Sequence, residues 1–375
     1  MNKISIFGSG LIAKLTAYSL VNLNNTKVEL ITKRYKSLRS PFYISVNNLT
    51  AEFLNDLKFK SVINRGRGIS EIKIYDSFKK IEETYDLNFT SGKKKKVLNY
   101  IIDKSYFEEK IDIELNKRVN FRIIENPKNF DILKFSDNLK IITSYEFANL
   151  FIRKNLNVLF KDYQEIAYTF SVHHEAKENN IAHQFFLKDG PIAFLPISNN
   201  ETFIVWSIKK KGALQNIVNN KKKIQTFFRE NFTKIFLNIK KISKIYKNEL
   251  SFYVNNNEEF RNKNFIAFGA PINKIHPLTG QGFNIISSDI LNLRSLVEEY
   301  SGLGMHLNSS SLIKSFYDKS ESNNFIFPVL IDGLRDFFDN RGVLTYSRQW
   351  LLRTINKSSI LKNLFMNTAN NGLRI

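Results

Sequence analysis

The stretch from Asn264 to Asp289 carries residues suited to holding a ligand through the backbone. A run of apolar residues, Phe265–Phe268, predicts a buried strand that ends at Gly269. An irregular loop with two prolines follows and leads into a helix whose first residues are Gly280, Gln281, Gly282, Phe283 and Asn284. Backbone N–H groups and a helix N-terminus would then meet at one point, which suits a planar or anionic group that needs a close approach. These residues indicate an anion or cofactor site.

A second glycine turn lies at the start of the chain. Ile4 and Ile6 alternate with polar residues as in a strand, and apolar residues recur at helical spacing from Leu11 onward. The turn between strand and helix has small residues at the three positions of a dinucleotide-binding fingerprint, which are Gly8, Gly10 and Ala13. Such a turn lets the backbone approach a pyrophosphate at the helix N-terminus. The context predicts a nucleotide site.

Metal and cysteine chemistry receive no support from the sequence. Three of the five histidines fall in a β-rich region, at His173, His174 and His183, with a spacing that matches no familiar ligand set. We interpret them as structural or solvent-facing residues and predict no metal. The chain has no cysteine, which excludes disulfides, thiolate zinc sites, iron–sulfur clusters and a cysteine nucleophile.

The loop that follows Gly269 resembles the flavin-contacting segment of the FAD-dependent aromatic-ring hydroxylases, in the ubiquinone-biosynthesis branch. In that family a strand is followed by His-Pro-Leu/Ile-x-Gly-Gln-Gly-x-Asn. The matching residues here are His276, Pro277, Leu278, Gly280, Gln281, Gly282 and Asn284. Looser similarities cover about the full length and include the N-terminal glycine turn, Gly190–Pro196 and Asp332-Gly333-Leu334.

The resemblance implies an FAD-dependent monooxygenase that hydroxylates the aromatic ring of a polyprenylated phenol in ubiquinone biosynthesis. In that family NAD(P)H or another reductant reduces FAD, molecular oxygen then reacts with it, and the C4a-hydroperoxide passes a hydroxyl group to the ring. The cofactor carries the chemistry, so the protein must bind it, orient the substrate and exclude water. Accordingly, no Ser-His-Asp set or pair of carboxylates stands out in the sequence.

The resemblance also assigns roles to individual residues. Pro277 would wall the flavin ring near its reacting carbon, and His276 would either contact cofactor or substrate or hold the loop. The implied cofactor contacts are Gly8, Gly10, Ala13, Glu146, Gly269, Pro277, Gly280, Gln281, Gly282, Phe283 and Asn284. The side chains that would line the substrate space, unless they pack in the core of the sheet, are Phe185, Phe194 and Trp206.

Several cofactor contacts expected from the family are altered, at Thr32, Ser105, Phe147 and Ala270. Thr32 stands where an acidic residue would hold the ribose, and Glu29 would take that place only in a shifted strand. Glu146 keeps a charge, but Phe147 replaces a glycine beside it. Because a lost charge-assisted hydrogen bond costs about 1.5–3 kcal/mol, a second hypothesis is a weakly flavin-binding or non-catalytic member that acts as a binding or assembly protein of a quinone-biosynthesis complex. A third is a non-hydroxylating flavoenzyme of the same fold.

The alternation of apolar residues predicts an α/β fold. A Rossmann-type FAD-binding domain would be interleaved with an antiparallel β-sheet substrate domain, followed by a helical C-terminal region. The predicted FAD-binding domain comprises residues 1–60, 98–160 and 262–300, the substrate domain 61–97 and 161–261, and the helical region 301–375. Within the substrate domain, Ile217 to Ile242 is predicted to be helical and basic.

The chain is strongly basic, with 56 Lys and Arg against 35 Asp and Glu and a formal net charge of +21. Such a charge attracts anionic lipid surfaces and nucleic acid, and it also fits the Lys- and Asn-rich composition of an AT-rich genome. No nucleic-acid-binding module is recognisable, so no nucleic acid partner is predicted. The basic stretch Asn324–Ile375 reads either as a core-packing helix pair or as an interfacial helix on anionic lipid.

The start of the chain has a glycine turn where a signal peptide would keep its cleavage region, and no apolar run approaches the roughly 20 residues of a membrane span. We therefore expect a cytoplasmic protein, with peripheral contact at the inner face of the cytoplasmic membrane.

Overall fold

Five apolar strands of the chain form a parallel sheet in the computed structural model. They are β1 (Asn2–Phe7), β2 (Thr26–Thr32), β8 (Phe121–Glu125), β9 (Leu139–Ile142) and β16 (Ile266–Ala267), in the order β16-β9-β1-β2-β8. The structure describes residues 2–33, 42–76, 87–90, 96–125, 135, 137–151, 157–175, 178–233, 235–255, 260–261, 264–277, 280–339, 350, 352 and 354–358. Leu278 and most of the chain beyond residue 339 lie outside these ranges. The Rossmann-type sheet predicted from the sequence is confirmed.

Helices cover the parallel sheet. Helix α1 (Gly10–Val21) follows β1 and packs against α4 (Lys104–Asn116), where Lys14 pairs with Asp112 at 2.8 Å. Almost every residue of α1 is buried, because α4 and the later helix α9 (Gly282–Gly302) both contact it. The short helix α5 (Tyr145–Phe151) follows β9. The start of α1 is thereby held at the carboxyl end of β1.

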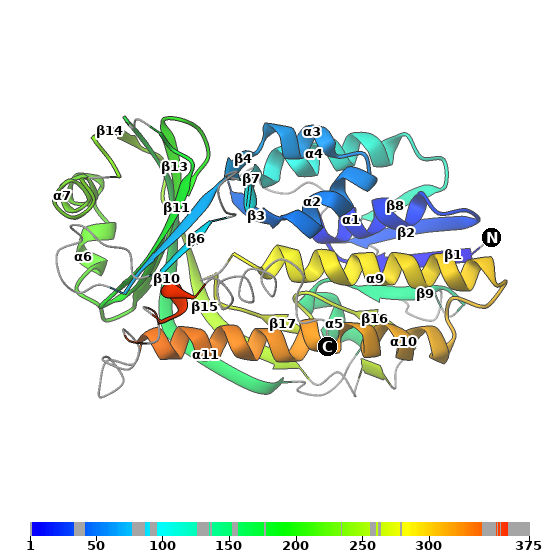
Figure 1. Ribbon diagram of the computed structural model, residues 1–375. Coiled ribbons are helices and arrows are strands. Elements are labelled where there is room, and N and C mark those ends of the chain that lie inside the picture. Colours follow the sequence, from blue (N-terminus) through cyan, green and yellow to red (C-terminus); the bar gives the residue numbers. More distant parts are fainter. Residues whose placement is uncertain are drawn as a thin grey trace.

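A small three-stranded sheet stands beside the parallel one. Its strands are β3 (Tyr43–Asn47), β7 (Asn99–Asp103) and β4 (Arg67–Ile69), in that order of pairing. Helices α2 (Asn48–Asp56) and α3 (Lys60–Arg65) connect β3 to β4. This unit lies between the parallel sheet and the large sheet (Figure 1).

The third sheet has nine strands. Eight follow one another in the order β17 (Asn273–Lys274), β15 (Tyr246–Asn255), β10 (Asn157–Glu175), β13 (Glu201–Lys209), β12 (Gly190–Pro196), β11 (Ile181–Leu187), β5 (Glu71–Tyr75) and β6 (Leu87–Thr90). The ninth, β14 (Asn238–Ile242), pairs with the end of β10. All pairs are antiparallel except β11 with β5. The predicted antiparallel β-region is present.

Helices α6 (Gln215–Val218) and α7 (Lys221–Asn231) cover the outer face of the large sheet (Figure 1). The prediction of a helix from Ile217 to Ile242 is therefore wrong in its second half. The helix ends at Asn231, and residues 238–242 form β14 instead. Pairing with β10, where the register shifts between His173 and His174, supplies backbone hydrogen bonds that the local sequence does not reveal.

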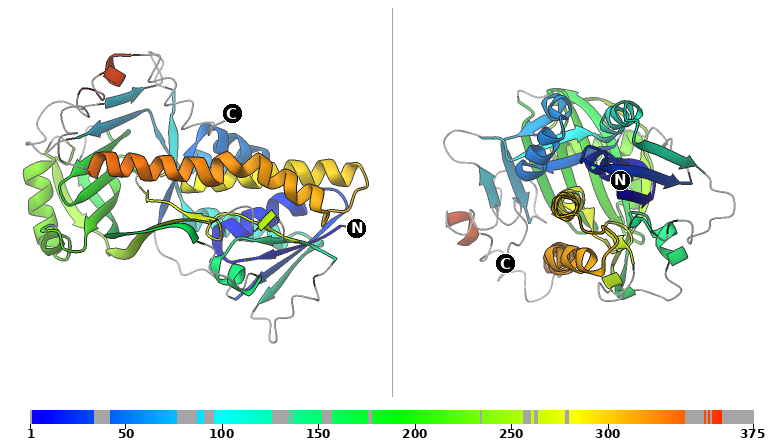
Figure 2. Two further views of the ribbon diagram at one scale, coloured as in Figure 1. Left: turned by 90° about the horizontal axis from the view of Figure 1, so that it is seen from below. Right: turned by 90° about the vertical axis from the view of Figure 1, so that its right-hand side faces the viewer.

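The C-terminal part forms a long helical rod. Helix α9 is followed by α10 (Ser310–Glu321), the π-helical turn η3 (Ser322–Ile326) and α11 (Phe327–Asp339), which continue without a break. At 1.5 Å per residue the run from α10 to α11 spans about 45 Å. It lies along α9 and reaches from the parallel sheet to the large sheet (Figures 1 and 2). Within the part of the chain that the structure describes, no helix is long and apolar enough to cross a membrane.

Candidate flavin site

The loop before α9 depends on glycines in the left-handed region. Gly269 has φ +70° and Gly280 has φ +62°. A Cβ added at Gly280 would lie 3.2 Å from the Cβ of Ser45 in β3, so a side chain there would be both strained and crowded. Pro277 is half-buried in the same loop. The structure thus confirms the order of strand, glycine loop and helix that the sequence predicted here.

Side chains at the start of α9 tie the loop to its neighbours. The Asn47 N–H donates to Oδ1 of Asn284 at 3.1 Å, and Asn284 Nδ2 donates to Oε1 of Gln281 at 2.9 Å. Asn47 itself caps α2 by accepting from the Thr50 N–H at 2.8 Å. Gln281 and Asn284 therefore fix the position of the loop with their side chains, which leaves backbone groups to face a ligand.

The N-termini of α1 and α9 share a feature. In the described structure, neither Ser9 before α1 nor Gln281 before α9 caps its helix with a side chain, and neither first turn has an acidic residue. By contrast, four other helices are capped by a side chain of Asn47, Asp103, Asn220 or Ser309. An uncapped N-terminus leaves N–H groups and positive potential available to an anionic ligand. The two helix starts that the sequence assigned to the cofactor are therefore open, as are those of the short helices α3 and α6.

The N-terminal glycine turn is held by close packing. A Cβ at Gly8 would lie 2.0 Å from Oγ1 of Thr143 and 3.3 Å from the Cβ of Ala13, so only glycine fits between the end of β1 and Thr143. Gly10 has φ +72° and begins α1. The buried carboxylate of Glu108 on α4 comes within 3.6 Å of a Cβ built at Gly10. Glu108, which the sequence analysis missed, places a negative charge close to the first turn of α1.

The adenosine end of the site differs from the family pattern in the structure as well. Thr32 is fully buried at the end of β2, and the next residue, Lys33, forms an ion pair with Glu146 of α5. Glu146, predicted to contact the cofactor, has 59% of its side chain exposed in this pair. Phe147 turns into the core and packs against Phe7, with ring centroids 5.9 Å apart.

The two remaining altered positions serve local structure. The N–H of Ser105 donates to the side chain of Asp103 at 2.8 Å, so Ser105 belongs to the capped first turn of α4. Ala270 is exposed, and its carbonyl accepts a hydrogen bond from the Tyr253 hydroxyl.

His276 faces the large sheet. Its Nε2 lies 3.0 Å from Oε2 of Glu165 in β10, and both side chains are buried. The other oxygen of Glu165 pairs with Arg335 of α11. Burial opposes the charge of Glu165, but the hydrogen bond and charge of His276 and the charge of Arg335 outweigh it, so the pKa of Glu165 lies below its ordinary value of 4.5. Glu165 and Arg335 were not predicted from the sequence, where the only signal was the charged residue after Asp332-Gly333-Leu334.

The two faces of the large sheet differ in side-chain size. Phe185, Phe194 and Trp206 lie on the outer face, in a core cluster with α7. Of the two roles that the sequence left open for them, packing in the core of the sheet is the observed one. The opposite, inner face carries small side chains, namely Ala167, Thr169, Ala193, Val205 and Ser207.

The inner face is the one turned toward the loop between Gly269 and Gly280, which we call the flavin loop. Glu165 on this face reaches His276, and Phe203 on the same face contacts Tyr43 of β3 at 5.1 Å. Ala193 and Val205 on it are only half-buried. The inner face thus turns small side chains, together with Phe203, toward the loop.

The histidines of the β-region have structural environments. His174 is buried and its Nε2 lies 2.8 Å from the Thr202 hydroxyl; burial lowers its pKa. Burial and the charge of Lys73 lower the pKa of His183 to about 3. His173 lies 3.3 Å from Glu201. Among the described residues no three His, Cys, Asp or Glu side chains are grouped as metal ligands.

The parallel sheet with its glycine turn, the loop before α9 and the adjoining antiparallel sheet define the class of the FAD-dependent monooxygenases. The squalene epoxidase family model matches residues 147–344, a little more than half of the chain. The chain belongs to the squalene epoxidase family.

Named relatives point to the same class. The chain is 21% identical to the mitochondrial ubiquinone biosynthesis monooxygenase COQ6 of Dictyostelium discoideum, over 98% of this chain and 90% of that protein. It is 24% identical to human COQ6 over 55% of this chain and 51% of that one, and 21% identical to the ubiquinone hydroxylase UbiL of Rhodospirillum rubrum over 57% and 49%. These last two alignments span about half of the relatives' length.

Solved structures share the fold. The p-nitrophenol 4-monooxygenase PnpA of Pseudomonas putida aligns over 100% of both chains with a TM-score of 0.75 at 12% identity. HpxO of Klebsiella pneumoniae, solved with FAD and uric acid, aligns over 98% of this chain and 96% of that one, with a TM-score of 0.68 at 10% identity. The predicted fold class is therefore confirmed.

Proposed function

We propose that this protein is an FAD-dependent monooxygenase that hydroxylates the aromatic ring of a polyprenylated phenol in ubiquinone biosynthesis. The observation that carries the proposal is the open N-terminus of α9, behind a glycine loop that faces the small-residue side of the large sheet. The relatives' names, which refer to ubiquinone, support the choice of substrate. Squalene and ubiquinone are both isoprenoid lipids, so the family name also agrees with an apolar substrate.

The residues present fit FAD at two helix starts. The first turn of α1, with Gly8, Gly10 and Ala13, would hold the pyrophosphate. The backbone from Gly280 to Asn284 and the first turn of α9 would hold the flavin ring, with Gly269 and Pro277 completing the loop. When bound, FAD supplies the redox chemistry of oxygen activation, with NAD(P)H or another reductant as electron donor.

The protein's own contribution would be binding, orientation and exclusion of water. Gln281 and Asn284 hold the start of α9 against β3, which keeps the loop in one conformation. The open N-terminus of α9 stabilises negative charge that develops on a group placed against it. The aromatic ring of the substrate would lie against the small side chains of Ala193 and Val205 on the inner face, while the sheet behind them is closed by the aromatic core.

The first experiment is the visible absorption spectrum of the purified protein, followed by an FAD titration if the protein is colourless. We expect flavin bands or saturable binding at micromolar FAD, and then oxygen consumption that depends on a prenylated phenol and a reductant. A protein that ignores FAD near millimolar concentration would overturn the proposal.

One observation favours a second candidate function. At the adenosine end, Thr32 offers no carboxylate, Lys33 and Glu146 pair with each other, and Glu108 adds a negative charge near Gly10. A protein with these features could keep the fold and act as a binding or assembly member of a quinone-biosynthesis complex. Lack of FAD binding together with co-purification of quinone-biosynthesis proteins would support it.

Peripheral membrane contact belongs to the same proposal. The outward face of η3 and α11 exposes Phe325, Val329, Leu330 and Leu334. The basic residues Arg348, Arg353 and Lys362 of this C-terminal stretch lie outside the described residues. In α11, Asp336 and Asp339 form ion pairs with Lys161 and Lys209 of the large sheet. The net charge of +21 and a lipid substrate favour a cytoplasmic protein that touches the anionic inner face of the membrane.

Vesicle binding tests this contact. We expect co-sedimentation with anionic phospholipid vesicles, weakened in a Leu330→Ser/Leu334→Ser variant. Leu303→Ser, which alters an exposed leucine at the far end of α9, is the control. If both variants bind the vesicles equally well, α11 does not take part in the membrane contact.

A further inference from the structure

The rod formed by α10, η3 and α11 is docked at both of its ends. At the α10 end, the Tyr317 hydroxyl accepts from the Ala267 N–H of β16 at 2.8 Å. At η3, the side chain of Asn273 donates to the carbonyl of Asn324 at 3.2 Å. The α11 end instead lies against the large sheet. One rigid element thus contacts the parallel sheet, the flavin loop and the substrate sheet.

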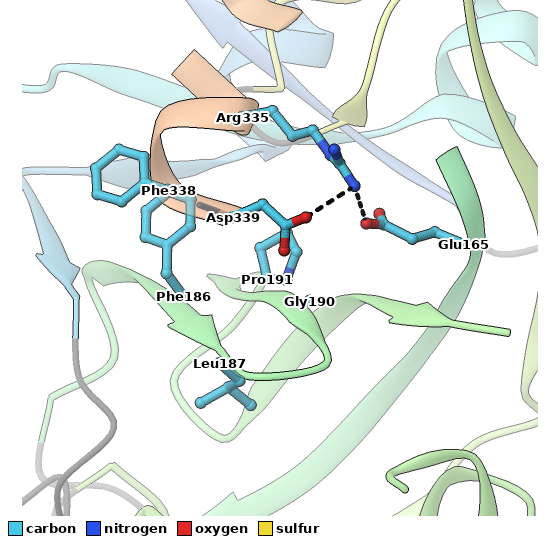
Figure 3. Close-up of a pocket in the computed structure, with 8 residues that line it drawn as sticks. All are labelled: Glu165, Phe186, Leu187, Gly190, Pro191, Arg335, Phe338 and Asp339. Atoms are coloured by element: carbon cyan, nitrogen blue, oxygen red, sulfur yellow. Dashed lines mark hydrogen bonds and ion pairs between the residues drawn. The ribbon is translucent and has the colours of Figure 1, made fainter. Parts of the chain in front are cut away.

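Two kinds of contact hold α11 on the large sheet. Peripheral contacts include the ion pair of Lys209 with Asp339 at 2.6 Å and the ring of Phe338 stacked on Phe186 at 3.6 Å. Between them remains a small cavity of about 10 Å³ (Figure 3). This is room for about one water molecule and not for a substrate ring. The packing here serves to fix the helix.

The central contact continues to the flavin loop. Arg335 pairs with one oxygen of Glu165, and the other oxygen meets His276, the residue before Pro277 (Figure 3 shows the Arg335–Glu165 pair). Tyr163 packs against both ends of this chain, 5.2 Å from the ring of His276 and with the Arg335 guanidinium 4.6 Å from its centroid. Asp336 at 2.9 Å and Asp339 at 3.8 Å also face Arg335.

The chain Arg335–Glu165–His276 is buried, and this makes it sensitive to the loss of one member. The side chains of Glu165 and His276 are 1% and 0% exposed, and that of Arg335 is 8% exposed. Breaking a buried pair leaves the partner's charge without compensation, whereas exposed pairs contribute little. Removal of the Arg335 charge is therefore expected to destabilise Glu165 in its buried position, and through His276 the loop.

We propose that Arg335 and Glu165 are positioning residues, which couple the docking of α11 to the conformation of the flavin loop through His276. The proposal rests on the proposed function, since the loop is taken to hold the flavin. Neither residue touches the reacting atoms in this scheme. Their role is to keep Pro277 and the glycines that follow in the binding conformation.

The test compares Arg335→Met and Glu165→Gln with Lys209→Met, a matched control that removes a peripheral ion pair of the same helix. Hydrogen exchange of the peptides covering 264–289 is measured in protein without FAD, and the FAD dissociation constant is measured by fluorescence. We expect faster exchange in the loop and at least about fivefold weaker FAD binding, within the usual range of coupling between sites, for the first two variants only. Arg335→Lys, which keeps the charge, should restore part of both.

The outcomes separate the two proposals. If wild-type protein binds no FAD, the proposed function fails, and the exchange data still decide whether Arg335 positions the loop. If FAD binds but Arg335→Met behaves as Lys209→Met does in both measurements, the positioning role is overturned. A global loss of folding in Arg335→Met would appear as fast exchange in β1 and β9 as well, and the milder Arg335→Lys and Glu165→Gln variants then decide.

Discussion

The two ends of the candidate cofactor site are built in different ways. At the flavin-ring end the loop before α9 relies on backbone conformation, with Gly269 and Gly280 at positive φ. At the adenosine end the expected contacts come from side chains, and there Thr32 is buried while Glu146 pairs with Lys33. Apart from Ala270, the first end keeps the family pattern, whereas the second departs from it at Thr32 and Phe147.

This difference indicates at which positions a substitution costs little binding or folding free energy. A residue at positive φ with a neighbour at van der Waals distance has few alternatives to glycine. A side-chain contact at an open surface can be exchanged for another, because solvent and neighbouring charges compensate for it. We therefore expect the flavin-ring end to dominate the affinity for FAD. The experiments on Gly280 and Glu146 below test that expectation, and those on Asp289 and Gly8 test the packing that supports the two ends.

The largest effect is expected at Asp289, which lies in α9 behind the flavin-ring end. Burial raises its pKa to about 7 from 3.8, although Ser320 and Asn324 act in the opposite direction. Within the described structure neither carboxyl oxygen has a hydrogen bond of good geometry. Because the folded state binds the proton more tightly than the unfolded state, stability is lost as the pH rises from about 4 to about 7 and stays low above it.

Asp289→Asn should remove this dependence and stabilise the protein at pH 8 by up to about 4 kcal/mol. Urea unfolding of both proteins at pH 5 and pH 8 measures it, and the difference between the two proteins cancels other titrating groups. An Asn variant that is less stable than wild type at pH 8 would show that the carboxylate has a partner, and that α9 is held by charge.

A second experiment tests whether close packing requires a glycine at Gly8, in the glycine turn before α1. Gly8→Ala should cost about 1–3 kcal/mol of unfolding free energy, as overpacking does, because the new Cβ would lie 2.0 Å from Oγ1 of Thr143. Adding Thr143→Ala removes that oxygen and should restore much of the loss in a denaturant titration. If the double variant is no better than Gly8→Ala, the requirement for glycine has another cause.

The sequence predicted the elements that depend on local periodicity and on glycine. The βαβ opening, the parallel sheet and the strand–loop–helix around Gly280 follow from apolar spacing and from turns that only glycine adopts cheaply. The alternation of side chains that predicts β11, β12 and β13 was also visible in the sequence. It separates two faces of a strand, however, and does not say which face meets the site, so the sequence left open whether Phe185 and Trp206 line the substrate space or pack in the core, where the structure places them.

The positioning residues could not be predicted for a related reason. Glu165 and Arg335 are 170 positions apart and meet only after the rod docks on the large sheet. A lone Glu in a strand normally indicates a solvent-facing residue, and burial reveals itself only through partners on other elements. The strand β14 was missed in the same way, since its pairing with β10 is non-local.

A third experiment isolates the role of the glycine loop in binding. Gly280 and Gly304 have φ +62° and +69°, but a Cβ at Gly304 meets nothing within 4 Å. Gly280→Ala and Gly304→Ala should therefore share the backbone strain of about 1–2 kcal/mol. Only Gly280→Ala should also weaken FAD binding, by about tenfold, or about 1.4 kcal/mol. If the two variants bind FAD with equal affinity in a fluorescence titration, the loop at Gly280 does not contribute to cofactor binding.

The smallest effect is expected at Glu146. Its side chain and that of Lys33 are 59% and 53% exposed, and an exposed ion pair contributes about 0–1 kcal/mol. Glu146→Gln should therefore change the FAD dissociation constant by less than about threefold, with Glu125→Gln on neighbouring β8 as the control. A loss of tenfold or more would mean that Glu146 leaves Lys33 to bind the cofactor. The adenosine end would then rely on a rearranged side-chain contact, and the contrast between the two ends would no longer hold.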